Sequence, residues 1–449
     1  MSKSFWTLGV FVVLFLGACS HTKVQVTPKD LSTYPQNANY YLEQATLNFT
    51  LPTLNLEELK KLKNDYLTKF FSPWSEEPNK DVDSVFWMRY SMLKSKGYGE
   101  NAKPYTLQEA QSLLDSMQLE SYPLAKTKAI ITKTTNVRAV PTIMPKFSKK
   151  DGYPFDRWQN SLIFAGTPVL ITHFDTSGRF AHIQSSFVYG WVELSDIGFV
   201  EAKDSATIQK FSEYITPNRD NITIKDTKGH FYTIARLGQI FALNPNFKSA
   251  QEYEIYIYTR TEFATAKITT ARVSKQDFLP FPNTLDSSLV ADFLTQLMGR
   301  KYGWGGMYEE RDCSALVRDI FAHNGIFLPR NSKAQMLYAN NAIDLSKMSA
   351  RKKEEFIIQN GTPFYTILWL QGHIMIYLGA IEGRVIVAHS AWSVTSGKKY
   401  ENLLGGVVVS SLYVGDEKNG VFSRNKTLLE RVGAMSDMRA LSEKILQSK

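Results

Sequence analysis

The spacing of apolar and polar residues changes along the chain and divides it into segments of different predicted structure. Apolar side chains recur at helical spacing in residues 54–71, 85–97 and 107–118, as expected for helices with one buried face. Prolines at positions 73, 78 and 104 separate these segments. The pattern predicts a helical module with extended arms over residues 20–126, and no residue in it indicates chemistry.

From residue 127 the pattern changes to short runs in which apolar and polar residues alternate. Residues 168–173 and 180–184 are two such runs, and a period of two predicts strands. Residues 135–138 (TNVR) and 189–192 (YGWV) resemble the opening and closing segments of bacterial SH3-like domains. We therefore expect two small SH3-like β-barrels, the second a diverged copy, at residues 127–200 and 201–284.

The last segment, residues 285–449, begins with helices and continues with strands. Helices are expected at residues 287–298 and 314–324, and Gly325 would end the second. Residues 372–379 and 384–390 have the composition of two strands joined by a turn. Helices followed by an antiparallel sheet give the order of an α+β papain-like core.

The composition is that of a globular protein with several domains. A chain of 449 residues exceeds one ordinary core, and 21% charged with 43% hydrophobic residues exclude a disordered or polytopic membrane protein. The net charge of +9 favours an anionic partner such as a membrane surface or a cell-wall polymer. No nucleic-acid motif is present, so we expect no nucleic-acid partner. No cluster has metal-ligand spacing, so we expect neither a metal nor an organic cofactor.

The first nineteen residues have the pattern of a lipoprotein signal peptide. Lys3 precedes an apolar run at residues 5–16, which is short for a membrane span and suits a signal peptide. Small residues precede Cys19, which predicts cleavage before Cys19 and lipid on its sulfur. Ser20 follows, a feature that resembles outer-membrane sorting. We expect a lipid anchor that holds the protein in the bacterial envelope, at the outer membrane and facing the periplasm.

Lipidation of Cys19 would leave Cys313 as the only free thiol, without a disulfide partner in the chain. Asp312 stands at the N-cap position of the expected helix, which places Cys313 in the first helical turn. The helix dipole and the unpaired N–H groups there favour a thiolate, so we expect a lowered pKa. The same N–H groups could hold an oxyanion. This pattern predicts a nucleophilic cysteine, and a buried structural cysteine is the alternative.

A thiol nucleophile needs a base and a group that orients the base. Of the seven histidines, His373 and His389 lie on expected strands after the cysteine, whereas His323 lies about 15 Å along the helix. A connection with an odd number of residues, with a bulge at Gly383, would place His373 opposite His389. A two-residue turn at 382–383 would put them on opposite faces. The sequence leaves both geometries open.

Several short motifs surround the cysteine and the two histidines. They are YGWGG at 302–306, DCSA at 312–315, LPRNS at 328–332 with Gln335, GHIMIYLG at 372–379 and AHS at 388–390. As a set they resemble the NlpC/P60 cysteine peptidases of bacterial cell walls. The whole chain is similar to the subgroup that places a helical N-terminal clip and two SH3-like domains before the peptidase. Its members cleave the bond between D-γ-glutamyl and a diamino acid in murein stem peptides.

Three features depart from the family's pattern. Ala315 stands where glycine is usual, and Asn331 stands where aspartate is common. The two strand histidines are 16 residues apart, a longer spacing than expected, which predicts an extended hairpin.

The resemblance implies a role for each matching residue. Cys313 would attack the scissile carbonyl, His373 would transfer the proton and His389 would fix the His373 ring. The Cys313 N–H and the Tyr302 hydroxyl would stabilise the oxyanion, and Asp312 would bind the free amine of an N-terminal L-Ala. The implied substrate-pocket residues are Ser314, Arg330, Asn331 and Ser332, with Trp304 as a wall and either Tyr189 or the loop around Asp156 closing one end.

Two other functions stay open at this level. One is a murein-binding lipoprotein with an inactive site, which the presence of Cys313 and both histidines disfavours. The other is an acyltransferase or amidase on the same scaffold, which would need an apolar groove for an acyl chain. In each case the expected partner is a murein peptide or its derivative, and the protein is expected to be a monomer.

Overall fold

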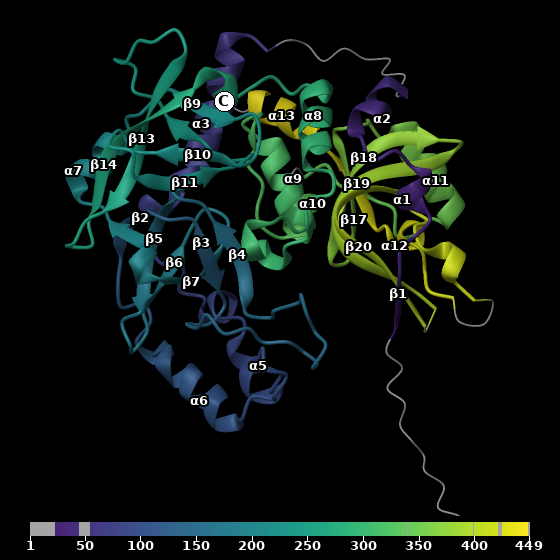
Figure 1. Cartoon of the computed structure of the whole chain (residues 1–449), viewed down its shortest axis with the longest axis horizontal. Coiled ribbons are helices and arrows are strands. Elements are labelled where there is room, and N and C mark those ends of the chain that lie inside the picture. The colour runs from purple at the N-terminus through teal and green to yellow at the C-terminus, as the bar shows by residue number, and fades with distance from the viewer. Residues whose placement is uncertain (1–22, 45–53, 339, 398, 421–423, 448–449) are drawn as a thin grey trace, which may run out of the picture.

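The computed structural model describes residues 23–44, 54–338, 340–397, 399–420 and 424–447. It contains a helical N-terminal part, two β domains and a C-terminal α+β domain, which confirms the predicted fold class. Figure 1 shows the two β domains on one side and the C-terminal sheet on the other, with α9 and α10 between them.

The helical N-terminal part does not form a separate bundle. Helices α3 and α6 begin with capping boxes, in which Asn55 pairs with Glu58 and Thr106 pairs with Glu109. The Trp74 indole donates to the Ala129 carbonyl of the first β domain over 3.0 Å. The described elements are β1 (Val24–Val26), α1 (Asp30–Thr33), α2 (Ala38–Gln44), α3 (Leu56–Phe70), η1 (Ser72–Trp74), α4 (Val82–Val85), α5 (Arg89–Lys94), α6 (Leu107–Ser116) and η2 (Leu119–Ser121).

The leader at residues 23–44 packs on the C-terminal domain, a contact that the sequence pattern does not reveal. Strand β1 pairs in parallel with β20, with Val24 opposite Tyr400. The buried Asp30 carboxylate accepts hydrogen bonds from the backbone and side chain of Ser411. Tyr41 is 2% exposed in the main core of the C-terminal domain. The chain therefore wraps from its beginning onto its last domain.

The first β domain is a seven-stranded sheet with the order β4-β3-β7-β6-β5-β2-β8. Inward-facing branched side chains such as Ile131, Ile171 and Ile183 form its core, as the alternating pattern predicts. Its strands are β2 (Thr127–Ile131), β3 (Thr135–Arg138), β4 (Gln159–Ile163), β5 (Pro168–Phe174), β6 (Phe180–Gln184), β7 (Tyr189–Glu193) and β8 (Ile197–Phe199), with η3 (Leu194–Asp196) before β8.

The second β domain consists of three small sheets, ordered β12-β9-β15, β10-β11 and β13-β14. Ion pairs fasten it to the C-terminal domain: Arg311 lies 2.6 Å from Asp220, and Arg236 lies 2.9 Å from Glu309. Its elements are α7 (Ala202–Ile208), β9 (Tyr214–Pro217), β10 (Ile222–Lys225), β11 (Phe231–Ala235), β12 (Phe241–Ala242), β13 (Glu252–Arg260), β14 (Ala266–Ser274), η4 (Lys275–Asp277) and β15 (Phe278–Phe281).

The C-terminal domain packs helices α8 and α9 on a seven-stranded sheet ordered β1-β20-β19-β18-β17-β21-β16. Helix α9 begins at Cys313 behind the Asp312 cap, and Gly325 follows its end at a φ of 71°, in agreement with the sequence pattern. The elements are α8 (Ser287–Leu297), η5 (Trp304–Glu309), α9 (Cys313–Ala322), α10 (Ser332–Tyr338), β16 (Ile343–Asp344), α11 (Ala350–Asn360), β17 (Thr366–Leu370), β18 (His373–Ile381), β19 (Arg384–Ser396), β20 (Tyr400–Ser411), η6 (Asp416–Lys418), α12 (Leu428–Arg431), β21 (Ala434–Asp437) and α13 (Met438–Gln447).

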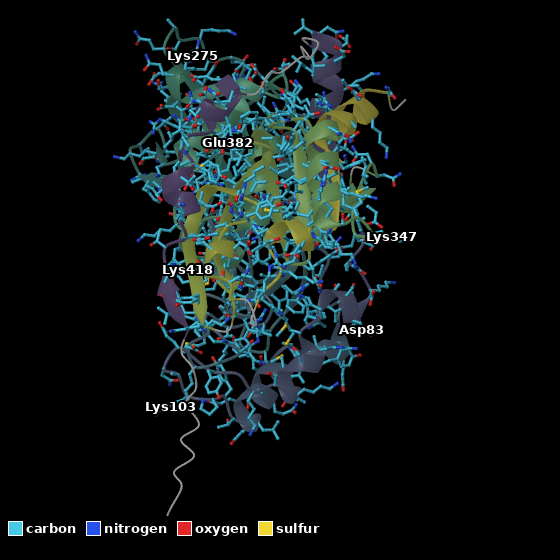
Figure 2. The ribbon with its side chains drawn as sticks, turned by 90° about the vertical axis from the view of Figure 1, so that its right-hand side faces the viewer. Asp83, Lys103, Lys275, Lys347, Glu382 and Lys418 are labelled. Carbon is cyan, nitrogen blue, oxygen red and sulfur yellow. The ribbon has the colours of Figure 1, made fainter. Side chains whose placement is uncertain are left out.

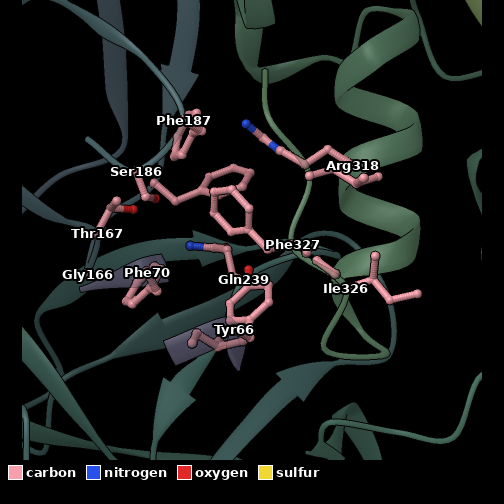
Figure 3. Close-up of a pocket in the computed structure, with 16 residues that line it drawn as sticks. Tyr66, Phe70, Gly166, Thr167, Ser186, Phe187, Gln239, Arg318, Ile326 and Phe327 are labelled. Carbon is pink, nitrogen blue, oxygen red and sulfur yellow. The ribbon is translucent and has the colours of Figure 1, made fainter. Parts of the chain in front are cut away.

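All four parts meet around a small cavity of about 50 Å³ (Figure 3). Tyr66 comes from α3, Phe187 from the first β domain, Gln239 from the second and Arg318 from α9. The Arg318 guanidinium lies 4.7 Å from the Phe187 ring centroid, a favourable cation–aromatic contact. This junction fixes the β domains against the helix that carries Cys313.

Charged side chains are spread around the outside of the molecule. The exposed residues Lys103, Lys347 and Lys418 lie at widely separated points of its outline (Figure 2). These three positive charges therefore do not form one patch.

Within the part of the chain that the structure describes, no helix has both the length and the apolar character needed to cross a membrane. The predicted signal peptide at residues 1–19 and the lipidated Cys19 lie outside the described residues.

Candidate active site

The two strand histidines are brought onto one face of the β18–β19 hairpin by a bulge. The connection is a two-residue turn at Glu382 and Gly383, both with positive φ, which by itself would put the histidines on opposite faces. The register shifts by one residue between Tyr377 and Gly379. Beyond this bulge Ile376 pairs with Ala388. His373 lies three residues from Ile376 and His389 lies one residue from Ala388. Because both separations are odd, the two histidine side chains lie on the same face of the hairpin. The extra residue thus sits inside the strand and not in the turn.

A chain of hydrogen bonds fixes the protonation of both rings. The Ser410 hydroxyl donates its hydrogen to the Ser411 carbonyl, so it can only accept from His389 Nε2, which lies 3.1 Å away. His389 Nδ1 then lacks a hydrogen and accepts from His373 Nε2 over 2.8 Å. His373 Nδ1 is left as the basic nitrogen. His389 therefore orients His373, in the manner of the third member of a catalytic triad.

Cys313 lies at the start of α9, beside the strand that carries His373. The amide of Ile374, the residue after His373, points at the Cys313 sulfur, and so does the amide of Ser314. The thiol belongs to a residue that is 8% exposed and is the one free cysteine among the described residues. The nucleophile candidate and the base candidate are thus brought to one place by α9 and β18.

The expected lowering of the cysteine pKa is wrong for this resting state. Burial, followed by the negative charge of Asp312, raises the pKa of the Cys313 thiol to about 12, and the neighbouring amides only partly offset this. Burial, followed by the charge of Arg431, lowers the pKa of His373 to about 4. Desolvation therefore outweighs the helix dipole. At neutral pH the pair consists of a thiol and a neutral imidazole.

Two donors near Cys313 are free to hold a developing oxyanion. Among the described residues, the Cys313 N–H and the Tyr302 hydroxyl have no hydrogen-bond partner. Burial and the nearby acidic groups of Asp312 and Cys313 raise the pKa of Tyr302. Its hydroxyl therefore stays protonated and can donate.

A cleft of about 440 Å³ opens beside the thiol. Its lining includes Cys313 and every substrate-pocket residue expected on the C-terminal domain: Tyr302, Trp304, Asp312, Ser314, Arg330, Asn331 and Ser332. Gly372, which precedes His373, also lines it. Trp304 is held as a wall, because its indole donates to the Asp156 carbonyl over 2.8 Å.

Asp312 is not the free carboxylate that the sequence interpretation requires. Its Oδ1 accepts from Ser314, Ala315 and Arg330, and its Oδ2 accepts from Gly305 and Arg330 at 2.6 Å. Burial favours the neutral acid, but the charge and hydrogen bonds of Arg330 prevail and hold the pKa below its usual value. Asp312 is thus a charged helix cap whose oxygens are already occupied.

Arg330 is equally committed to structure, although it lines the cleft. Its Nε donates to the Ser161 hydroxyl of β4 over 2.8 Å, and its other nitrogens bind Asp312 and Ser314. It therefore joins the nucleophile helix to the first β domain.

The first β domain forms one wall of the cleft through β4 and the loop before it. Gln159 donates to the Gly305 carbonyl over 3.0 Å, and Gln159 and Asn160 both line the cleft. Asp156 itself is buried and bonded to Arg138 at 2.7 Å, so it holds this loop in place. The loop around Asp156, which is predicted to close one end of the groove, therefore contributes residues to the cleft wall, and Asp156 itself holds this loop in place.

Tyr189 does not line the cleft, contrary to expectation. Its ring packs in the core between the helical part and the first β domain, with Phe86 and Trp158. Its carbonyl instead accepts from Asn160 over 2.8 Å and so positions a residue that does line the cleft.

Sequence reasoning missed the lining residues outside the C-terminal motifs. These are Trp87, Met88, Ser91, Ser95, Lys146, Ser148, Arg157, Gln159 and Asn160. No motif marks them, because domain packing alone brings them to the site. Ser410 was missed because it lies on β20, and only the pairing of β20 with β19 brings it to His389. Across the described ranges no group of three or more His, Cys, Asp or Glu side chains could hold a metal ion.

The fold and the site define a cysteine-type hydrolase with a papain-like core. Four family models match the chain: the N-terminal stabilising domain of NlpC/P60 proteins at residues 8–122, an SH3 domain of SH3b1 type at 145–193, an SH3 domain of SH3b2 type at 203–246, and the NlpC/P60 family at 299–408. The chain is thus an NlpC/P60 family protein with an N-terminal stabilising domain and two SH3 domains, which confirms the family prediction.

One solved structure shares the fold of this chain. An NlpC/P60 endopeptidase from Photobacterium damselae subsp. piscicida is 21% identical, with a TM-score of 0.77 over 91% of this chain and 97% of that one. An NlpC/P60 family protein from Bacillus cereus ATCC 10987 is 14% identical, with a TM-score of 0.44 over 69% of this chain and 98% of that one. No curated protein sequence matches the chain.

Proposed function

We propose that the protein hydrolyses murein stem peptides at the bond between D-γ-glutamyl and a diamino acid such as diaminopimelate. The observation that carries this proposal is the hydrogen-bond chain from Ser410 through His389 to His373, next to Cys313 and an open cleft. Membership of the NlpC/P60 family supports a peptidase acting on peptidoglycan peptides.

The proposed reaction starts from a neutral thiol and a neutral imidazole. As the Cys313 sulfur attacks the γ-carbonyl carbon, the thiol proton moves to His373 Nδ1. The Cys313 N–H and the Tyr302 hydroxyl donate to the oxyanion. His373 then protonates the leaving amine of the diamino acid, which leaves a thioester. A water molecule, deprotonated by His373, hydrolyses the thioester and regenerates the thiol.

The cleft lining favours a peptide over an acyl chain. Most residues that line the cleft are polar or charged, including Ser91, Lys146, Arg157, Gln159 and Asn160. An acyltransferase would need a long apolar groove at this place. The polar side chains of the lining offer donors and acceptors to the amide and carboxylate groups of a stem peptide.

We also propose that the protein is anchored through Cys19 in the outer membrane and faces the periplasm, as a monomer. The sequence pattern of residues 1–19 supports this location. Labelling with a radioactive fatty acid and its loss in Cys19→Ala would test the anchor.

The activity is tested by mass spectrometry of L-Ala-γ-D-Glu-diaminopimelate after incubation with the wild type, Cys313→Ala, His373→Ala and His230→Ala. His230 is an exposed histidine on the second SH3 domain and serves as the matched control. We expect L-Ala-D-Glu and diaminopimelate from the wild type and His230→Ala only. Equal absence of products from all four proteins would favour a binding protein, and a transfer product would favour an acyltransferase.

A parallel substrate with an acetylated N-terminus tests the requirement for a free amine. Because both oxygens of Asp312 are occupied, any such requirement must arise from other acceptors. Equal cleavage of both substrates would remove the requirement altogether.

A further inference from the structure

Lys146 is a buried cation on the wall of the cleft. It lies in the loop between β3 and β4 of the first SH3 domain, it is 4% exposed, and it lines the cleft beside Ser91 and Arg157. Within the described part of the chain, its ammonium has neither a hydrogen-bond acceptor nor an ion-pair partner. One aromatic ring, that of Trp158, lies 5.5 Å from Nζ.

An ammonium group in this position is energetically unfavourable without a counter-charge. Burial lowers the pKa of Lys146, and no acidic side chain counteracts it. The carboxylate of Asp156 cannot serve, because it binds Arg138 and the amides of Lys146 and Trp158. Among the described residues, no acidic side chain therefore balances the charge of Lys146.

The side chain is also held in place by its surroundings. Its backbone amide donates to Asp156 over 2.8 Å, and its carbonyl accepts from the Arg157 amide over 2.7 Å. The aliphatic stem lies against Gly97, where an added Cβ atom would come within 2.7 Å of Lys146 Cε. The ammonium is thus positioned before any ligand arrives, which lowers the entropy cost of binding.

A second cation stands next to it. The Arg157 guanidinium lies 5.9 Å from the Trp304 ring centroid and donates to the Ser148 hydroxyl over 3.1 Å, without an acidic partner in the described structure. Arg330 and Asp312 neutralise one another. The remaining charges of the cleft lining are therefore the two cations of Lys146 and Arg157.

We propose that Lys146, with Arg157 beside it, forms a subsite that binds a carboxylate group of the substrate peptide. The inference rests on the function proposed above. A γ-D-glutamyl stem peptide carries two suitable groups: the α-carboxylate of D-Glu, which the γ-linkage leaves free, and the terminal carboxylate of the diamino acid. Charge-assisted hydrogen bonds to either group would satisfy the buried ammonium. The enzyme would then discriminate against stem peptides in which that carboxylate is amidated.

The test compares kcat/KM for three peptides: L-Ala-γ-D-Glu-diaminopimelate, its D-isoglutaminyl analogue and its C-terminal amide. We expect the wild type to cleave one amidated peptide about 10- to 100-fold less efficiently than the parent, since a hydrogen bond to a charged group is lost. The affected peptide identifies the carboxylate. Lys146→Met should lower kcat/KM for the parent and abolish the discrimination, and Lys146→Arg should keep part of it. Lys149→Met, an exposed lysine in the same loop, should behave as the wild type.

Binding of the same three intact peptides to Cys313→Ala, measured by calorimetry, gives a readout that needs no catalysis. Equal affinity and equal cleavage of all three peptides by proteins with an intact Lys146 would overturn the subsite and leave the proposed hydrolysis standing. Absence of cleavage together with weaker binding of one amidated peptide would overturn the hydrolysis and support the subsite. A folded Lys146→Met protein that still discriminates against the amidated peptide would also overturn the proposed subsite.

Discussion

The Ser410 hydroxyl donates its hydrogen to the Ser411 carbonyl, and this hydrogen bond determines which nitrogen of His373 can act as base. Ser410→Ala should let His389 adopt either tautomer and so weaken its hold on His373. We expect kcat to fall roughly 3- to 10-fold, the equivalent of one neutral hydrogen bond, with KM unchanged. Steady-state kinetics with the stem tripeptide measures this.

Ser410→Thr keeps the hydroxyl and provides the matched control for that substitution. It should retain most of the activity. If Ser410→Ala changes only KM or the folding stability and leaves kcat unchanged, a positioning role for Ser410 is contradicted.

The pH dependence of the reaction follows from the environment of His373. Because burial lowers the pKa of His373 to about 4, the imidazole stays neutral and basic as the pH falls to that value. We expect the acid limb of kcat/KM near pH 4, well below the 6.5 of an ordinary histidine. A pH–rate profile measures it, and an acid limb near 6.5 would show that the imidazole is not desolvated in the free enzyme.

At the scale of single elements, Tyr41 of α2 tests whether the leader stabilises the C-terminal domain. The side chain is 2% exposed in the core around α8 and α9, whereas its neighbour Tyr40 is 38% exposed. Tyr41→Ala should lower the free energy of unfolding by about 3 kcal/mol through loss of apolar contact and a cavity. Denaturant unfolding followed by tryptophan fluorescence measures this.

Tyr40→Ala is the control, since Tyr40 is 38% exposed and does not belong to that core, and we expect a change below about 1 kcal/mol. Similar small effects of both substitutions would mean that the leader adds little to the stability of the domain.

The elements also show what a sequence pattern can and cannot predict about this site. Asp312, the apolar stripe after it and Gly325 predict α9 and the position of Cys313, because caps and helical spacing are local signals. The face of His389 could not be predicted, since it depends on a bulge between Tyr377 and Gly379 that no turn residue marks. The cysteine pKa could not be predicted either, because burial is a property of the packed domains.

At the scale of the whole molecule, five histidines are buried in their neutral form. Burial is the largest cause that lowers the pKa of His173, His182, His323, His373 and His389 below 6.5, to about 3 for His182 and His323. The unfolded chain binds more protons at these sites than the native one, so stability falls as the pH drops from 6.5 towards 3. The stabilisation is fully present above pH 6.5.

We therefore expect the Tm to be nearly constant between pH 7 and 8 and to fall steadily below pH 6.5. Each such histidine contributes a slope of roughly 1.4 kcal/mol per pH unit between its two pKa values. Differential scanning calorimetry over this range measures the effect. A protein that melts at the same temperature at pH 5 and pH 7.5 would contradict it.

Fold class and family could be predicted from the sequence, because the hydrophobic periodicity and the motifs each lie within a single domain. The full lining of the cleft could not be predicted, since Lys146, Gln159 and Asn160 reach it only through contacts between domains. The packing of the leader on the C-terminal domain cannot be predicted either, because β1 is only three residues long and its partner β20 is distant in the sequence.

The pairing of β1 with β20 has a consequence for biogenesis. Val24 is synthesised long before its partner Tyr400, because the two residues lie at distant positions in the sequence. Closing so large a loop is slow, and β1 must stay unpaired until β20 has been synthesised. Chains that terminate before β20 cannot complete this edge of the C-terminal sheet. The C-terminal sheet is thus completed only after β20 has been synthesised.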